Sequence, residues 1–400
     1  MNETATVASP TQTIDVVRSR MLTWPLARLL FADFAAMTSF YLLLPAVPMY
    51  AGVVGAGGLG AGLSTAVLML VAVAAESATP RLAAAIGFHR ALALGLALLG
   101  GPALLLPMCS RLPGLLAVSV IRGVGFAIVV TAVGALTASM VPADRRGEGL
   151  GLLGVVATVP AILALPLGVW LVPVVGFTSV FAFGAVACLL GAVAVFGLPS
   201  GSRATHEQLA IGDALRDPAL MRPAAVFAAT AVAGGIVVTF VPTALGQNAS
   251  GLAGVSLLVQ ALTATATRWL AGRYVDRYPN RSGARLLAGG VAAAGVGILG
   301  LVLTDKPSVV LAGMVVFGAG FGIAQSASIT MMMNRVHPGG YGAASAVWNM
   351  AYDLGWGVGA ASFGVLVAVT GFPAAFALTA LLLLAVLPLT RTRANRRLHR

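Results

Sequence analysis

Apolar runs of about twenty residues recur along the whole chain, and short segments that carry charge, glycine or proline separate them. Because an α-helix rises about 1.5 Å per residue, a run of that length crosses the hydrocarbon core of a bilayer, which is about 30 Å thick. Hydrophobic residues make up 59% of the chain and charged residues 9%, a composition that excludes an ordinary soluble protein. The sequence therefore predicts an all-α polytopic membrane protein.

The runs predict twelve transmembrane helices, arranged as two pseudo-symmetric halves of six helices each. They occupy residues 29–50, 59–79, 91–108, 115–140, 149–174, 177–198, 223–246, 251–270, 286–304, 308–333, 342–369 and 372–389. A polar stretch separates the sixth run from the seventh, and polar segments flank the whole set. We therefore divide the chain into a cytoplasmic N-terminal tail (1–28), an N-terminal six-helix bundle (29–198), a cytoplasmic linker (199–222), a C-terminal six-helix bundle (223–390) and a basic cytoplasmic tail (391–400).

The basic residues indicate the orientation of the chain. With both termini in the cytoplasm, every Lys and Arg lies in a cytoplasmic segment except Arg111, Lys306 and the intramembrane Arg122. Basic residues accumulate on the cytoplasmic side of membrane proteins, so we expect a multi-pass protein of the inner (plasma) membrane with both termini inside. The basic clusters are short and do not form one soluble face, which argues against nucleic acid as a partner despite the net charge of +12. We expect a monomer surrounded by membrane lipid.

Charged residues inside the apolar runs predict the functional centre. Asp33 lies in the first run and Arg122 in the fourth, and no acid lies near Arg122 in the sequence. Ionisable groups within a membrane cost several kcal/mol and normally face a bundle interior, where they pair or move protons. We interpret Asp33 and Arg122 as a buried pair that couples transport to protons. Asp353 is a second intramembrane carboxylate, and either Asp33 or Asp353 fits the role of proton carrier.

Side chains at helical spacing predict the wall of a substrate cavity. Four-residue intervals place a thioether and an aromatic hydroxyl on the face of Asp33, and an amide and aromatic rings on or beside the face of Asp353. The tenth run adds a phenylalanine and a glutamine, a repeat that packing with a satisfied amide explains equally well. The predicted cavity residues are Met37, Tyr41, Phe321, Gln325, Asn349, Tyr352 and Trp356.

Two short motifs resemble those of the major facilitator superfamily. Residues 271–285 read AGRYVDRYPNRSGAR, which resembles the family's G-x-x-x-D-R/K-x-G-R-K loop, with Gly272, Asp276 and Arg277 in place. The resemblance implies a gating loop that latches the cytoplasmic side, and an ordinary positively charged turn is the alternative. Residues 121–125 resemble, in shortened form, a family element whose arginine lies near the proton-coupling carboxylate. The equivalent first-half loop, residues 80–90, departs from the family pattern because Ala84 stands in place of the acid.

The resemblance and the residues together predict a function. The first helix is similar to the opening helix of drug and metabolite efflux members of the superfamily. We therefore expect a secondary active transporter that exports small organic or drug-like molecules by alternating access, with a small-molecule substrate and protons as its partners. Proton-coupled uptake of a small metabolite uses the same parts and is the alternative.

Classes other than transporters have less support. The only lysine, Lys306, follows an aspartate rather than a glycine, so the chain carries no ATP-binding loop of the G-x-x-x-x-G-K-[ST] type. No set of His, Cys, Asp and Glu has catalytic or metal-binding spacing, which disfavours a membrane-embedded enzyme and leaves a scaffold with no positive sign. We expect no cofactor, no metal and no enzymatic activity.

Overall fold

The computed structural model describes residues 23–141, 146–198, 214–246, 249–278, 283–337 and 340–390, and the regular structure within these ranges is helical throughout. The first half contains α1 (Trp24–Val53), α2 (Gly57–Glu76), α3 (Thr79–Ile86), α4 (Phe88–Gly100), the 3-10 helix η1 (Gly101–Met108), α5 (Leu112–Met140) and α6 (Arg146–Val195). The second half contains α8 (Pro218–Leu245), α9 (Ser250–Arg277), α10 (Gly283–Gly300), α11 (Pro307–Met333), α12 (Tyr341–Val386) and the 3-10 helix η6 (Leu387–Thr390).

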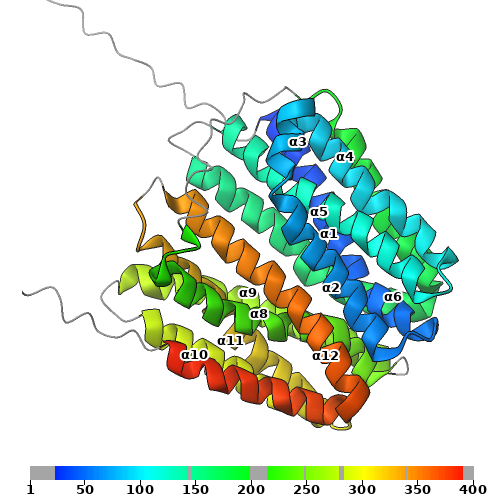
Figure 1. The fold of residues 1–400 in the computed structure, drawn as a ribbon, viewed down its shortest axis with the longest axis vertical. Helices are drawn as coiled ribbons and strands as arrows, with labels where there is room; N and C mark the ends of the chain where they lie inside the picture. The colour runs from blue at the N-terminus through cyan, green and yellow to red at the C-terminus, as the bar shows by residue number, and fades with distance from the viewer. Residues whose placement is uncertain are drawn as a thin grey trace, which may run out of the picture.

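The number of membrane crossings depends on two long helices. Among the described residues, 10 helical segments are long and apolar enough to cross a membrane, with α4 and η1 counted as one. α6 has 50 residues and α12 has 46, about twice the length that one crossing needs. Each is interrupted by a glycine in the left-handed region, Gly176 (φ 78°) and Gly371 (φ 76°), and Figure 1 shows α12 turning back on itself. The all-helical prediction is confirmed, whereas the count of twelve requires α6 and α12 to be divided at these glycines.

The two halves lie side by side, with α1 to α6 in one and α8 to α12 in the other (Figure 1). They meet where α2 packs against α12, α6 against α9 and α1 against α8. α1 begins and η6 ends on the same side of the bundle, which we call the terminal side, and the opposite side is the far side (Figure 1). Consecutive passes alternate in direction, so α2 and α5 begin on the far side.

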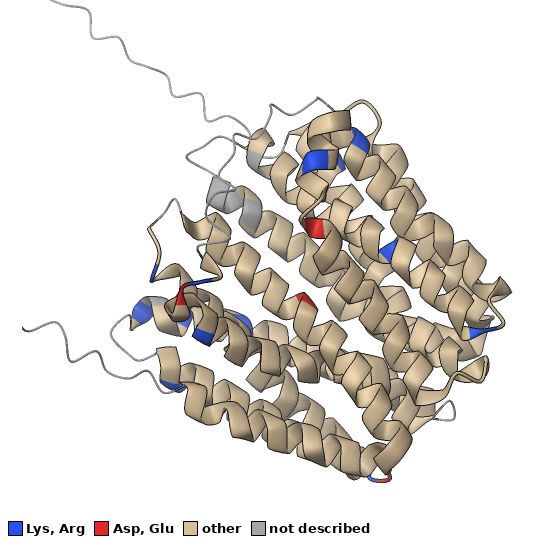
Figure 2. Ribbon diagram, in the orientation of Figure 1, with Lys and Arg blue, Asp and Glu red and all other residues tan. Residues whose placement is uncertain are grey.

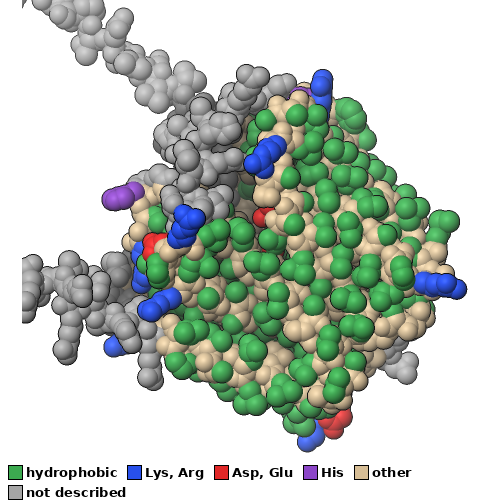
Figure 3. Space-filling view, viewed as in Figure 1, with side chains coloured by type: hydrophobic (Ala, Val, Ile, Leu, Met, Phe, Trp, Pro, Cys, Tyr) green, Lys and Arg blue, Asp and Glu red, His purple; other side chains and the backbone are tan. Residues whose placement is uncertain are grey.

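The outer surface fits a lipid environment. Figure 3 shows hydrophobic side chains over most of the visible face, and Val174 and Val369 are 77% and 81% exposed. Lys and Arg lie mainly towards the ends of the bundle, while acidic positions occur inside it (Figure 2). Since exposed apolar surface of this extent is unfavourable in water, the surface supports the membrane assignment made from the apolar runs.

Small residues bring the halves into close contact along α2 and α12. A Cβ atom added at Gly62 would lie closer than 3.0 Å to the backbone oxygen of Ala360, and one added at Gly364 would lie 2.8 Å from that of Gly58. At Gly357 it would lie 3.1 Å from side-chain atoms of α2. We call this contact, formed by Gly58, Gly62, Gly357, Ala360 and Gly364, the α2–α12 seam. Gly58 and Gly62 lie in the first two turns of α2, on the far side. Because small residues let helices approach closely, the seam closes the space between the halves on that side.

Several helices extend beyond the apolar runs that predicted them, as α1, α8 and α9 show. α1 begins at Trp24 because Thr23 caps it, with Oγ1 accepting a hydrogen bond from the amide of Leu26 at 3.4 Å. α8 begins at Pro218, inside the predicted linker, because Oδ1 of Asp217 accepts from the amide of Ala219 at 2.8 Å. α9 continues to Arg277 rather than ending at residue 270. Polar and charged residues thus continue these helices where the hydropathy pattern indicated their ends.

Candidate functional site

The predicted pair of Asp33 and Arg122 is not formed in this structure. Both side chains are buried, at 3% and 2% exposure, and no ion pair joins them. Asp33 lies about 14 Å along α1 from the terminal side, whereas Arg122 lies about 15 Å along α5 from the far side. Since the two helices run in opposite directions and α5 is about 43 Å long, the residues differ in depth by roughly 14 Å.

Each of these buried groups keeps an unsatisfied atom. Oδ2 of Asp33 has no hydrogen-bond partner. Nε of Arg122 donates to the backbone oxygen of Leu99 at 3.0 Å, and its Nη2 has no partner. Buried polar groups are normally hydrogen-bonded, so these two atoms are exceptions to that rule.

The terminal end of the α2–α12 contact carries two carboxylates from opposite halves. Gly62, Met69 and Glu76 recur every seven residues on α2, so Glu76 lies on the face that packs against α12. Asp353 lies one turn before Gly357 on the facing side of α12 and is 9% exposed. Glu76 is half-buried and close enough to Asp353 for their charges to repel one another. The contact between the halves therefore changes from small residues on the far side to like charges towards the terminal side.

Aromatic side chains form a column along α12. The rings of Trp348 and Tyr352 stack with centroids 5.9 Å apart, and those of Tyr352 and Trp356 with centroids 5.2 Å apart. Phe227 of α8 stacks on Trp348 at 4.5 Å and an angle of 7°. Phe321 of α11 lies 6.2 Å from Tyr352. Three predicted cavity residues are thus brought together, while Trp348 and Phe227 join them without having been predicted.

Arg268 is the charged residue that the sequence analysis missed. The prediction placed it at the cytoplasmic end of a helix, but α9 continues for nine more residues, so Arg268 lies about 14 Å along α9 from the terminal-side end of that helix, with its side chain exposed. Its guanidinium carbon is 6.0 Å from the ring centre of Trp348. The charges of Arg268 and Asp353 both act on Tyr41 of α1 and Tyr352 of α12. Groups from both halves therefore face one space, which we call the central site.

The remaining predicted cavity residues differ in exposure. Met37, Phe321 and Gln325 are buried, whereas Tyr41 and Tyr352 are half-buried. Asn349 is exposed, one turn closer to the terminal side than Asp353. The face of α12 is thus closed at Gly364 and open at Asn349, which indicates that the space between the halves widens towards the terminal side.

Comparison with known proteins identifies the family. A sequence model of the Major Facilitator Superfamily matches residues 29–360. The chain belongs to the major facilitator superfamily. No curated protein matches it in sequence.

Solved structures agree with the superfamily fold. A bacterial homologue of the human lysosomal transporter Spinster, inward-facing and unoccupied, has a TM-score of 0.78 at 14% identity, with 92% of this chain and 95% of that chain covered. The nucleoside transporter NupG has a TM-score of 0.71 at 14% identity, with coverage of 92% and 100%. A POT family transporter in complex with 5-aminolevulinic acid has a TM-score of 0.74 at 12% identity, with coverage of 91% and 94%. At these identities the likeness concerns the fold alone, and it is the fold of transporters.

The segment that resembles the gating loop of the major facilitator superfamily is partly helical. Gly272, Asp276 and Arg277 lie in the last turns of α9, while residues 279–282 and the side chain of Asp276 lie outside the described part of the chain. The equivalent first-half segment is also not a loop, because residues 79–86 form α3, which ends at Gly87 with φ 90°. Within the described residues, no group of His, Cys, Asp and Glu could hold a metal ion.

Proposed function

We propose that this member of the superfamily is a proton-coupled secondary transporter that exports small organic molecules by alternating access. The observation that carries the proposal is the placement of carboxylates from both halves between the two bundles. Asp33 lies in α1, Glu76 in α2 and Asp353 in α12, and no ion pair neutralises any of them among the described residues. Carboxylates at this depth are costly unless they exchange protons or meet a cationic group.

Protonation gives these carboxylates a direct effect on the conformation. When Glu76 and Asp353 are both ionised, their repulsion holds the terminal ends of α2 and α12 apart. Like charges in a site of low dielectric constant repel one another more strongly than they do in water. A proton on either residue removes that repulsion and shifts the equilibrium between the two conformations. The terminal side then closes, and the α2–α12 seam opens on the far side.

The central site favours an amphipathic substrate with a flat apolar part. The rings of Trp348, Tyr352 and Trp356 provide a continuous aromatic surface. Asp33, Asp353 and Arg268 provide charges of both signs around it. Export is the direction that the similarity of the first helix to efflux members implies. We assign the terminal side to the cytoplasm of the inner membrane because the predicted cytoplasmic segments hold nearly all the basic residues.

Everted membrane vesicles test this function. With a pH gradient that is acidic inside, addition of an export substrate should release protons and collapse part of the gradient. Asp33→Asn and Asp353→Asn should abolish the response while the protein still inserts, because neither amide can carry a proton. Asp305→Asn is the matched control, since Asp305 is exposed in the turn before α11 and should leave the response intact. Proton release that requires substrate loaded inside the vesicles would establish uptake instead, and an undiminished response in both variants would remove these carboxylates from the mechanism.

A further inference from the structure

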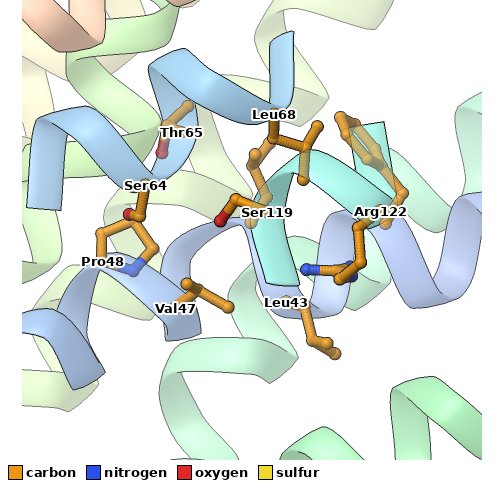
Figure 4. Close-up of a pocket in the computed structure, with 10 residues that line it drawn as sticks. Leu43, Val47, Pro48, Ser64, Thr65, Leu68, Ser119 and Arg122 are labelled. Carbon is orange, nitrogen blue, oxygen red and sulfur yellow. The ribbon is translucent and has the colours of Figure 1, made fainter. Parts of the chain in front are cut away.

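A small cavity lies between α1, α2 and α5 of the first half (Figure 4). Helices α1, α2 and α5 line it, and its volume of about 10 Å³ is close to the lower limit for holding one water-sized group. Six of its lining residues are apolar. The polar lining residues are Ser64, Thr65, Ser119 and Arg122.

Arg122 brings an unneutralised charge to this cavity. Its side chain is 2% exposed, Nε donates a hydrogen bond to the backbone oxygen of Leu99, and Nη2 has no hydrogen-bond partner. Figure 4 shows the guanidinium directed into the group of lining side chains, towards the side where Ser119 lies. The titratable group that acts on Arg122 is the thiol of Cys188, and no carboxylate forms an ion pair with it among the described residues.

A buried guanidinium in this position requires a counter-charge. An arginine side chain does not lose its proton in proteins, and a buried charge without a partner costs several kcal/mol. One water molecule can accept the hydrogen bond from the free N–H, but it leaves the positive charge of the guanidinium without a counter-charge. An anion satisfies both, because the same atom accepts the hydrogen bond and neutralises the guanidinium.

Hydroxyl groups supply further donors. Ser119 is 2% exposed and lines the cavity without a recorded hydrogen bond to another residue. Thr65 accepts a hydrogen bond from Thr239 of α8 at 3.2 Å and keeps its own hydroxyl hydrogen. Ser64 donates to the backbone oxygen of Ala61 at 2.8 Å, so its hydrogen is already used. Nη2 of Arg122 and the hydroxyls of Ser119 and Thr65 therefore make three donors around one space.

We propose that this cavity binds a small anion, either chloride or a carboxylate group, through Arg122, Ser119 and Thr65. A chloride ion is slightly larger than a water molecule, so lining side chains such as Leu68 must move slightly to admit it. The bond between Thr65 and Thr239 joins the two halves next to the α2–α12 seam, so a bound anion also favours the conformation that is closed on the far side. The proposal goes beyond proton coupling and does not depend on it.

Thermal unfolding of the purified full-length protein tests the site without a substrate or a gradient. Replacing gluconate, a carboxylate too large for this cavity, with chloride at constant ionic strength should raise the unfolding temperature in a saturable way, because a ligand that binds only the folded state stabilises it. Acetate serves as the carboxylate probe. Stabilisation by both chloride and acetate would identify a general anion site. Stabilisation by only one of them would show which of the two anions the site binds.

Variants locate the effect. Arg122→Gln should abolish the anion dependence, and Ser119→Ala should weaken the apparent affinity at least about tenfold, the equivalent of about 1.4 kcal/mol. Arg111→Gln is the matched control, because this arginine lies in the turn before α5 on the far side and should leave the anion response unchanged. If Arg122→Gln does not fold, chloride-35 line broadening on the wild type and on Ser119→Ala supplies the same comparison. An anion response that is absent from the wild type, or equal in wild type and Ser119→Ala, overturns the proposal.

Discussion

A disulfide across the far end of the α2–α12 seam should lock the transporter. A Cβ atom at Gly58 would lie 3.8 Å from Cβ of Val367, which matches the mean Cβ–Cβ distance of disulfides, about 3.8 Å. Gly58→Cys with Val367→Cys should therefore oxidise readily. Because a disulfide tolerates a Cβ–Cβ distance of up to about 4.5 Å, the linked helices can separate by only about 0.7 Å. That distance is far too small to admit a substrate from the far side, so transport should fall to background.

The assay needs a background free of the native cysteines, with Cys109→Ser and Cys188→Ala. A protease site placed between residues 201 and 212 separates the halves, and their co-migration on a non-reducing gel measures the extent of cross-linking. Transport should return when a reductant is added, and each single cysteine should behave as the background does. If fully cross-linked protein transports as fast as the protein treated with reductant, the halves need not separate at the seam, and the reasoning is refuted.

Three further substitutions probe packing and the central site. Gly235→Ala should destabilise the protein by about 1–3 kcal/mol in thermal unfolding, since the new Cβ would lie 2.7 Å from Cα of Trp356, whereas Gly134→Ala, with nothing within 4 Å, should not. Arg268→Met should lower the stability by about 0.5–1 kcal/mol in thermal unfolding, because a cation at an exposed site beside an aromatic face contributes about that much; an unchanged unfolding temperature would contradict the contact of Arg268 with Trp348. Trp348→Phe removes the 2.9 Å hydrogen bond from Nε1 to Oγ of the fully buried Ser328 and should cost about 1–3 kcal/mol of stability, so an unchanged unfolding temperature would contradict that contact.

The helical fold was accessible from the sequence because the length of an apolar run is set by the thickness of the membrane. The ends of the helices were not, because the prediction ended helices where polar and charged segments began. Arg268 and Asp217 show the reason. A long basic side chain can lie inside a helix that borders a polar space, and an acid can cap a helix rather than interrupt it.

The candidate site was predicted in part. Helical spacing placed Trp356 on the face of Asp353, with Tyr352 beside that face. A step of four residues back from Tyr352 reaches Trp348, a signal that the prediction did not use. Asp33 and Arg122 do not pair in this structure, because helix direction, which follows from the order of the passes, places them at different depths. The proximity of Glu76 to Asp353 depends on the register of α2 against α12, which no local pattern contains.

The glycine reversals in α6 and α12 repeat one device in both halves. In each, a phenylalanine follows the glycine and packs near a second phenylalanine that is fully buried, with ring centroids 6.0 Å apart for Phe177 and Phe181 and 6.4 Å apart for Phe372 and Phe376. Since a single glycine makes the reversal, no flexible loop separates the two arms of each hairpin at that end. The two arms of each hairpin therefore move as one rigid unit when a half of the transporter changes its orientation.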